Sequence, residues 1–95
     1  MAFFVYIMAS KRHGTLYIGS TDSLSVRVGQ HQDKVRPHSF TARHDVTLLV
    51  WFEVFDSREG AKLRERQMKE WKRAWKIRLI EEGNPDWRDL SDLLR

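Results

Sequence analysis

A chain of 95 residues without cysteine has room for one folded domain, and it excludes disulfides, thiolate zinc sites and cysteine nucleophiles. Hydrophobic residues at 41% and charged residues at 32% are typical of a globular protein and exclude a disordered chain. The net charge of +4 favours polyanionic partners, because lysine and arginine side chains that neutralise phosphates release condensed counterions. We therefore expect a single domain over residues 1–95, with nucleic acid as a candidate partner.

Residues 1–8 are apolar, but they lack the basic leader and the cleavage site of a secretory signal. The chain contains no apolar run of about 18 residues, the length that a membrane-spanning helix needs. We therefore expect no membrane association. Together with the lack of cysteine, this pattern favours a cytoplasmic location.

Two apolar segments near the start of the chain predict a β-hairpin. Residues 3–8 are aromatic and β-branched, and residues 15–18 resume this pattern. Between them, residues 10–14 carry the serine, lysine and glycine that are typical of turns.

The register of this hairpin would bring two tyrosines together. A turn centred between Lys11 and Arg12 places Tyr6 opposite Tyr17. Opposite residues of antiparallel strands point to the same face of the sheet. We therefore expect the two phenol rings to be cross-strand neighbours.

A helix should follow the hairpin. Residues 20–23 supply side-chain oxygens suited to capping a helix that begins near Ser23. Four residues then recur at the spacing of one helical face: Leu24, Arg27, Val28 and His31. We expect this face to pack against the hairpin, which would bring Arg27 and His31 close to it.

The next two segments differ sharply in character. Residues 32–45 lose all periodicity and are rich in cations and histidine, which predicts a long loop. This loop is either a solvated connector or a phosphate-contacting segment, because loops on a rigid scaffold often carry binding residues. Residues 47–55 are almost continuously apolar and predict a third strand with both faces largely covered.

A long helical pattern occupies residues 57–82 and begins with a motif similar to a capping box at residues 56–59. It should break near residues 72–74 and must stop at residues 83–85, which read Gly-Asn-Pro. Four residues form its apolar stripe: Ala61, Met68, Trp71 and Trp75. A short terminal helix that covers the core should follow, with Trp87 as a packing residue.

Glu65 lies on the apolar stripe of this helix instead of on its polar side. Burying a carboxylate without a partner costs several kcal/mol, so a cation should lie beside it. Three interpretations follow from the pattern: an ion pair with an arginine such as Arg27, a metal ligand, or simple exposure to solvent.

Several of these residue types suit phosphodiester hydrolysis, which needs a cation, a base and stabilisation of the leaving oxygen. The planar guanidinium of Arg27 matches phosphate oxygens, and Glu65 is a hard oxygen ligand of the kind that holds Mg²⁺. A tyrosine needs a neighbouring cation or metal-bound hydroxide to act as a base at neutral pH, because its reference pKa is about 10. Arg27 and His31 are candidates for that help.

The segments Val5-Tyr6-Ile7 and Tyr17-Ile18-Gly19, followed by Arg27 and His31, resemble the two motifs of the GIY-YIG nuclease family. The leading glycine of the first motif is replaced by Val5, whereas the tyrosine is kept. The resemblance extends to near residue 90 and looks closest to the small single-domain branch, which is similar to the N-terminal nuclease domain of an excision-repair protein. It implies an α+β fold with a small three-stranded antiparallel sheet, in the order β-β-α-β-α-α, flanked by helices.

The resemblance also implies a catalytic set, which comprises Tyr6, Tyr17, Arg27, His31 and Glu65. In the implied mechanism Tyr6 is the base, Tyr17 positions the phosphate and Arg27 stabilises charge. Glu65 would hold the metal, Mg²⁺ or Mn²⁺. His44 replaces what looks in the family like a tyrosine or another proton-handling residue, and Asn84 is a possible helper at the place of a family asparagine.

These inferences predict a metal-dependent endonuclease that acts on DNA, with RNA as the alternative substrate. The expected nucleic-acid contacts are Lys11, Arg12, Lys34, Arg36, Arg43, His44 and Lys69. No separate sequence-reading domain is visible, so recognition should follow backbone shape at branched, gapped or flapped DNA in repair or recombination. A protein partner is a second source of specificity.

Two other classes of protein fit the sequence less well. A non-catalytic nucleic-acid-binding module on the same scaffold would bind in a salt-dependent manner without cleavage. The chain nevertheless keeps every side chain that the chemistry needs. A covalent tyrosine strand-transferase is disfavoured because the chain is too small for the arginine cluster and clamps that such chemistry commonly uses.

Overall fold

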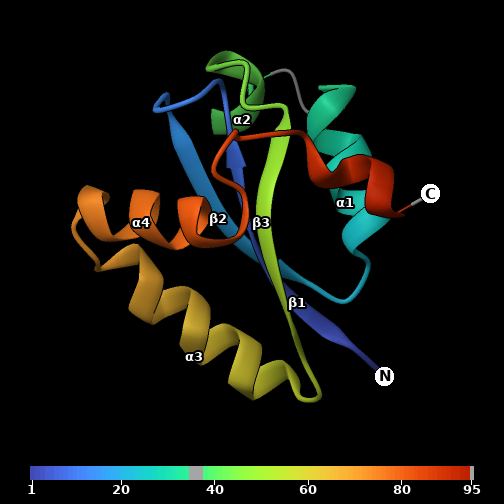
Figure 1. The fold of residues 1–95 in the computed structure, drawn as a ribbon. Helices are drawn as coiled ribbons and strands as arrows, with labels where there is room; N and C mark the ends of the chain where they lie inside the picture. The colour runs from blue at the N-terminus through green and yellow to red at the C-terminus, as the bar shows by residue number, and fades with distance from the viewer. Residues whose placement is uncertain (35–37, 95) are drawn as a thin grey trace.

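A computed structural model describes residues 1–34 and 38–94 of the chain. They form a three-stranded antiparallel sheet with helices on both faces (Figure 1). The strands are β1 (Phe3–Ala9), β2 (Leu16–Thr21) and β3 (Leu48–Phe55), and their order in the sheet is β2-β1-β3. The expected α+β fold with a three-stranded antiparallel sheet is confirmed.

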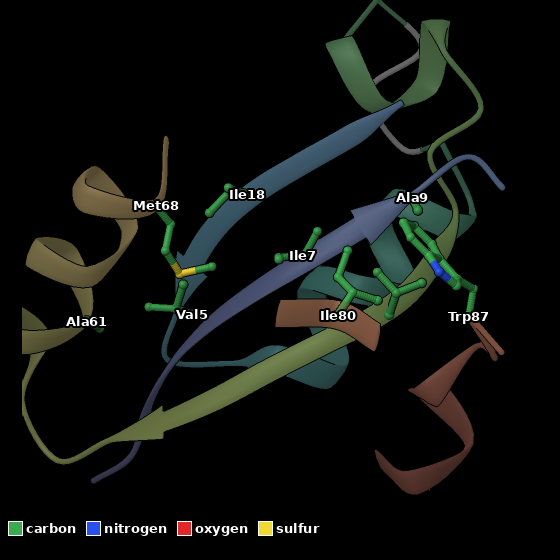
Figure 2. Packing of buried hydrophobic residues seen from close by; sticks show 9 residues of the cluster. Val5, Ile7, Ala9, Ile18, Ala61, Met68, Ile80 and Trp87 are labelled. Atoms are coloured by element: carbon green, nitrogen blue, oxygen red, sulfur yellow. The ribbon is translucent and has the colours of Figure 1, made fainter. Parts of the chain in front are cut away.

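The central strand β1 is covered on both faces, as its apolar sequence requires. On one face Val5, Ile7 and Ala9 pack against α3 (Arg58–Lys69) and α4 (Arg73–Gly83) (Figure 2). On the other face Tyr6 and Met8 pack against α1 (Leu24–Gln32) and the 3₁₀ helix η1 (Leu90–Leu94). The sheet therefore lies between two layers of helices (Figure 1) and separates two hydrophobic cores, one on each face.

The hairpin has a different register from the expected one. Tyr6 pairs with Gly19, and Tyr17 pairs with Met8, so the two tyrosines are diagonal instead of opposite. The connection spans residues 10–15, in which the Ser10 amide donates to the Thr15 carbonyl. The resulting slip is two residues along the strand, and side chains alternate with a period of two. Both tyrosines therefore still point to the same face.

The segment predicted as a long loop contains a helix. Within the described part of residues 32–45, α2 (Phe40–Arg43) forms one short helical segment. The Ser39 hydroxyl caps it by accepting a hydrogen bond from the Ala42 amide. Thr41 and Ala42 are buried, so contacts with the rest of the domain hold this helix where the polar sequence indicated a loop.

The predicted long helix is divided into α3 and α4 at residues 70–72, which overlaps the break expected near residues 72–74. The Ser57 hydroxyl caps α3 by accepting from the Gly60 amide. Trp75 lies beyond the break and is 51% exposed, so its assignment to the buried stripe was wrong. The break changes the helical phase, which removes Trp75 from the face that carries Ala61 and Met68.

The third strand is fully buried only in its first half, although Phe52 and Phe55 in its second half still pack against the two cores. Leu49 and Val50 are buried, but Glu53 and Val54 are exposed, which contradicts the expectation that both faces are largely covered. β3 is an edge strand, and its last residues extend beyond the helices that cover its start.

Trp87 is 3% exposed and belongs to the core, as expected, although it precedes η1 instead of lying in a helix. Among the described residues, no helix has the length and apolarity to cross a bilayer.

Candidate active site

Gly19 allows the two motif tyrosines to meet over the edge strand β2. Its cross-strand partner Tyr6 extends over it, and a β-carbon at position 19 would lie 2.7 Å from the Tyr6 hydroxyl oxygen. It would also lie 3.0 Å from Cε2 of Tyr17. With glycine in this position the two ring centroids lie 6.2 Å apart. The glycine of the second motif is therefore required by close packing of the tyrosine rings.

A chain of hydrogen bonds joins three elements behind these rings. The Tyr6 hydroxyl lies 3.0 Å from Nε2 of His31 on α1. Nδ1 of the same ring lies 2.9 Å from Oγ1 of Thr41 on α2, and Thr41 is 3% exposed. Burial, followed by the positive charge of Arg27, lowers the pKa of His31, so the imidazole is neutral at neutral pH. The buried threonine therefore fixes the orientation of a neutral imidazole against Tyr6.

Burial also keeps Tyr6 protonated in the free protein. It is the largest cause that raises the pKa of the phenol, and Tyr17 and Glu65 raise that pKa further. Arg27 acts in the opposite direction without compensating for these effects. At neutral pH almost no Tyr6 is ionised to act as a base by itself, and its bonded partner His31 is the group that can accept a proton there.

His31 lines a hollow of about 280 Å³ on the α1 side of β2. Its wall comprises Tyr17, Arg27, Gln30, His31, Ser39, Phe40 and Thr41. Three of the predicted residues therefore share one hollow with the short helix α2. The contribution of Phe40 and Thr41 was missed from sequence, where the only signal was an aromatic residue after a capping serine in a polar segment.

Glu65 reaches the same region from the opposite face of the sheet. Its side chain is 15% exposed and accepts a hydrogen bond of 2.5 Å from the hydroxyl of Ser20 on β2. Nζ of Lys69 donates to its second oxygen at 2.7 Å. Burial raises the pKa of Glu65, but the hydrogen bonds from Lys69 and Ser20 outweigh it and hold that pKa below the usual range. The expected cation is present, but it is Lys69 and not Arg27.

Because Ser20 and Gly19 are adjacent on β2, their side-chain positions face opposite sides of the sheet. Ser20 holds Glu65 on the α3 side, while the Tyr6 ring crosses Gly19 on the α1 side. The open edge of β2 is therefore where the carboxylate and the phenol approach each other, close enough for Glu65 to affect the pKa of Tyr6.

The donor set at Glu65 fits a hard cation held by few protein ligands. The described residues include no group of three or more histidine, aspartate or glutamate side chains that could hold a metal ion. Mg²⁺ is often bound through a single carboxylate, with water and substrate phosphate completing its coordination. A partly exposed, ionised Glu65 beside the Ser20 hydroxyl meets this requirement, whereas a nitrogen-rich zinc site is not formed by the described residues.

The predicted basic contacts are distributed unevenly. Lys11 and Arg12 are exposed in the β1–β2 connection, and Arg43 is exposed at the end of α2. Lys34 forms an ion pair with Asp45, which neutralises part of its charge. Lys69 lies at the site itself through its contact with Glu65.

The remaining predicted residues are Arg36, His44 and Asn84. Arg36 lies outside the described residues. His44 stacks on Phe40 with ring centroids 4.5 Å apart, so it reaches the hollow only through that ring. Asn84 is buried, and its amide donates to the Val50 and Arg88 carbonyls. These bonds hold the chain after α4 against β3, so the described contacts give Asn84 a structural task.

Known proteins are similar to this chain over the region that carries these motifs. The GIY-YIG catalytic domain family matches residues 2–78. The UPF0213 protein of Staphylococcus haemolyticus is 32% identical over 79 residues, covering 83% of this chain and 94% of its own. The UPF0213 protein of Syntrophus aciditrophicus is 34% identical over 83 residues, covering 87% and 93%.

The fold has a solved counterpart. The solution NMR structure of a UPF0213 protein from Bacillus halodurans is similar with a TM-score of 0.58 and 25% identity. The similarity covers 98% of this chain and 97% of that one. Motifs, relatives and fold thus agree, and the chain belongs to the GIY-YIG catalytic domain family, in its small UPF0213 branch.

Proposed function

We propose that this protein is a divalent-metal-dependent endonuclease that hydrolyses phosphodiester bonds in DNA. The proposal rests on the convergence of the five predicted catalytic side chains. Tyr17, Arg27 and His31 line one hollow. Tyr6 bonds His31 and approaches Glu65 at the adjoining edge of β2. Membership of a nuclease family supports a nucleic-acid substrate. The net positive charge supports the same class of ligand.

In this proposal Arg27 and Tyr17 bind the scissile phosphate. Both line the hollow, and Arg27 is half-buried, so its guanidinium is partly shielded from water. A fixed cation with a planar fork stabilises the charge that develops on the phosphate oxygens during hydrolysis. The Tyr17 hydroxyl donates to a phosphate oxygen and sets the position of the bond that breaks.

Tyr6 and His31 move the proton. The attacking water gives its proton to the Tyr6 oxygen as the phenol passes its own proton to Nε2 of His31. The relay uses the His31 tautomer in which Nδ1–H donates to Oγ1 of Thr41, so that Nε2 is free to accept. This relay lets a protonated tyrosine serve as the immediate base, as its position in the family's motif implies, although its own pKa is raised.

Glu65 would hold the metal ion, and members of the family are in general divalent-metal dependent. When bound, the ion supplies positive charge to the phosphate and lowers the pKa of coordinated water. The Ser20 hydroxyl fixes the direction of the carboxylate, and Lys69 keeps it ionised until the ion and substrate arrive. Mg²⁺ and Mn²⁺ are the ions that fit this oxygen ligand.

The substrate in this proposal is structured DNA met during repair or recombination. A domain of this size contacts the backbone of a short stretch, so shape governs recognition more than base sequence. A partner protein that delivers the domain to its target would add specificity.

The test is cleavage of labelled duplex, nicked, gapped, flapped and branched DNA, with matching RNA, in Mg²⁺, Mn²⁺ or chelator. We expect cleavage of structured DNA that depends on the metal and falls by at least about 100-fold in Glu65→Gln and Arg27→Ala. Glu53→Gln, a change of a glutamate on the opposite edge strand, should leave the rate unchanged. Salt-dependent binding without cleavage of any substrate would instead identify a non-catalytic binding module.

A further inference from the structure

We propose that the exposed ring of Phe40 is a stacking platform for an unpaired nucleotide beside the scissile phosphate, and that Lys76 contacts the phosphate of that nucleotide. This inference rests on the proposed nuclease function and names its substrate class, DNA with at least one unpaired nucleotide next to the cleavage site. Neither residue belongs to the motifs of the family.

Phe40 lies between two hollows on the surface. The ring is 49% exposed, and it lines the hollow that contains Arg27 and His31, here called the catalytic hollow, as well as a second hollow of about 270 Å³. Tyr17 also lines both. Phe40 and Tyr17 therefore form the boundary between the two hollows, and a strand that runs from one hollow to the other crosses this pair of rings.

The ring is held in place before any ligand arrives. Its neighbours are His44, with centroids 4.5 Å apart, and Tyr17, with centroids 6.4 Å apart. The Ser39 cap and the buried Thr41 anchor α2 on either side of it. A preorganised aromatic ring loses little conformational entropy when a base stacks on it.

The second hollow combines the two kinds of surface that a nucleotide needs. Leu16 and Ile18 of β2 give it an apolar floor, and Lys69 and Lys76 give it cations. Nζ of Lys76 donates to the carbonyl of Lys69 at 3.4 Å, which places the Lys76 amine at the junction of α3 and α4, while the Lys69 amine bonds Glu65. Apolar surface for a base beside cations for a phosphate is the pattern of single-strand binding sites.

Base pairing decides which DNA can use this arrangement. In a continuous duplex each base is stacked and paired, so its face is not available to an outside ring. A flap, gap or strand end exposes that face without an unpairing cost. The Phe40 platform should therefore favour such DNA over a duplex of the same sequence.

The experiment is a double-mutant cycle between protein and DNA, measured by fluorescence anisotropy in chelator so that no cleavage occurs. One partner is wild type or Phe40→Ala, and the other is flapped DNA with a base or an abasic residue at each unpaired position in turn. We expect Phe40→Ala to weaken binding of the intact flap by about tenfold. When the base that stacks on Phe40 is replaced by an abasic residue, the same substitution should have little further effect on binding. Phe40→Tyr should restore binding. Val54→Ala should have no effect, because Val54 is also an exposed apolar residue but lies on the opposite edge strand.

Lys76→Ala gives an independent readout. It should weaken binding of intact and abasic flaps alike and reduce the slope of log Kd against log salt by about 1. Binding of flapped DNA that is unchanged by Phe40→Ala, in a variant whose melting curve shows a folded protein, would overturn the platform while leaving the nuclease proposal intact. Failure of the wild type to bind any DNA would overturn both.

Discussion

The hydroxyl of Ser20 donates to Glu65 across 2.5 Å and so fastens the open edge of the sheet to helix α3. This bond decides where the carboxylate points, because the only other described donor to Glu65 is the flexible amine of Lys69. A serine outside the motif tyrosines therefore controls the geometry of the proposed metal ligand.

Removing that bond should impair the site more than the fold. We expect Ser20→Ala to reduce cleavage about tenfold and to raise the metal concentration needed for half-maximal rate, at a stability cost of about 1 kcal/mol. Ser57→Ala is the matched control, because loss of the α3 cap costs a similar amount of stability. The measurements are the cleavage rate and the free energy of unfolding in urea for both variants. If Ser20→Ala and Ser57→Ala lose the same activity, the effect of Ser20 on cleavage is explained by lost stability and not by the geometry of Glu65.

The contrast between two glycines tests the packing of the tyrosine rings. Gly19→Ala should destabilise the protein by about 2 kcal/mol and abolish cleavage, because its β-carbon would overlap the Tyr6 hydroxyl and ring. Gly29→Ala, in α1 with no atom near the new carbon, should stabilise by about 0.5–1 kcal/mol. Thermal melting compares them directly, and a Gly19→Ala protein as stable and active as wild type would contradict the close approach.

The proposed relay predicts how cleavage depends on pH. His31 must be neutral to accept a proton, and burial beside Arg27 lowers its pKa below the usual 6.5. The rate should therefore be full above about pH 6.5 and fall as the pH drops through that lowered pKa. The acid limb should disappear in His31→Gln, which should retain only a low, pH-independent rate.

The same shift affects stability. Because the unfolded chain binds a proton to His31 at higher pH than the folded protein does, stability should rise with pH through this window and level off above about pH 6.5. Unfolding midpoints of the wild type and His31→Gln at several pH values measure this difference. If the difference in stability instead changes with pH above 6.5, the pKa of His31 is raised in the folded protein. The imidazole would then have a favourable negative partner, which contradicts the relay.

Glu81 predicts a second pH dependence, remote from the site. Its carboxylate accepts from Nε1 of Trp87 at 2.8 Å and contacts Nε2 of His13 at 2.9 Å. These bonds, that of Trp87 first, lower the pKa of Glu81. The stabilisation is thus present above the usual glutamate range and lost as the pH falls through the lowered pKa.

Glu81→Gln should lower the melting temperature at neutral pH and flatten the acid side of the stability curve. The adjacent, exposed Glu82 supplies the control, since Glu82→Gln should leave both nearly unchanged. DNA cleavage at temperatures below the melting transition should be unaffected, because the Glu81 contacts join the β1–β2 connection to Trp87 and not to the catalytic hollow.

The family resemblance implied the antiparallel sheet, whereas local patterns in the sequence sufficed for its three strands, the face shared by Tyr6 and Tyr17, and the helical face that carries Arg27 and His31. They did so because these relationships repeat with periods of two and 3.6 residues, and even the two-residue error in register left the tyrosines on one face. The stripe position of Glu65 likewise indicated a carboxylate that needs a cation.

Tertiary structure alone decided which partners those residues meet. The choice of Lys69 and Ser20 for Glu65, the helix that brings Phe40 and Thr41 to the hollow, and the exposure of Trp75 all depend on how separate elements pack. A pattern along one segment records which face is buried, but not which distant atoms fill the space beside it, because that is set by the relative positions of the packed elements.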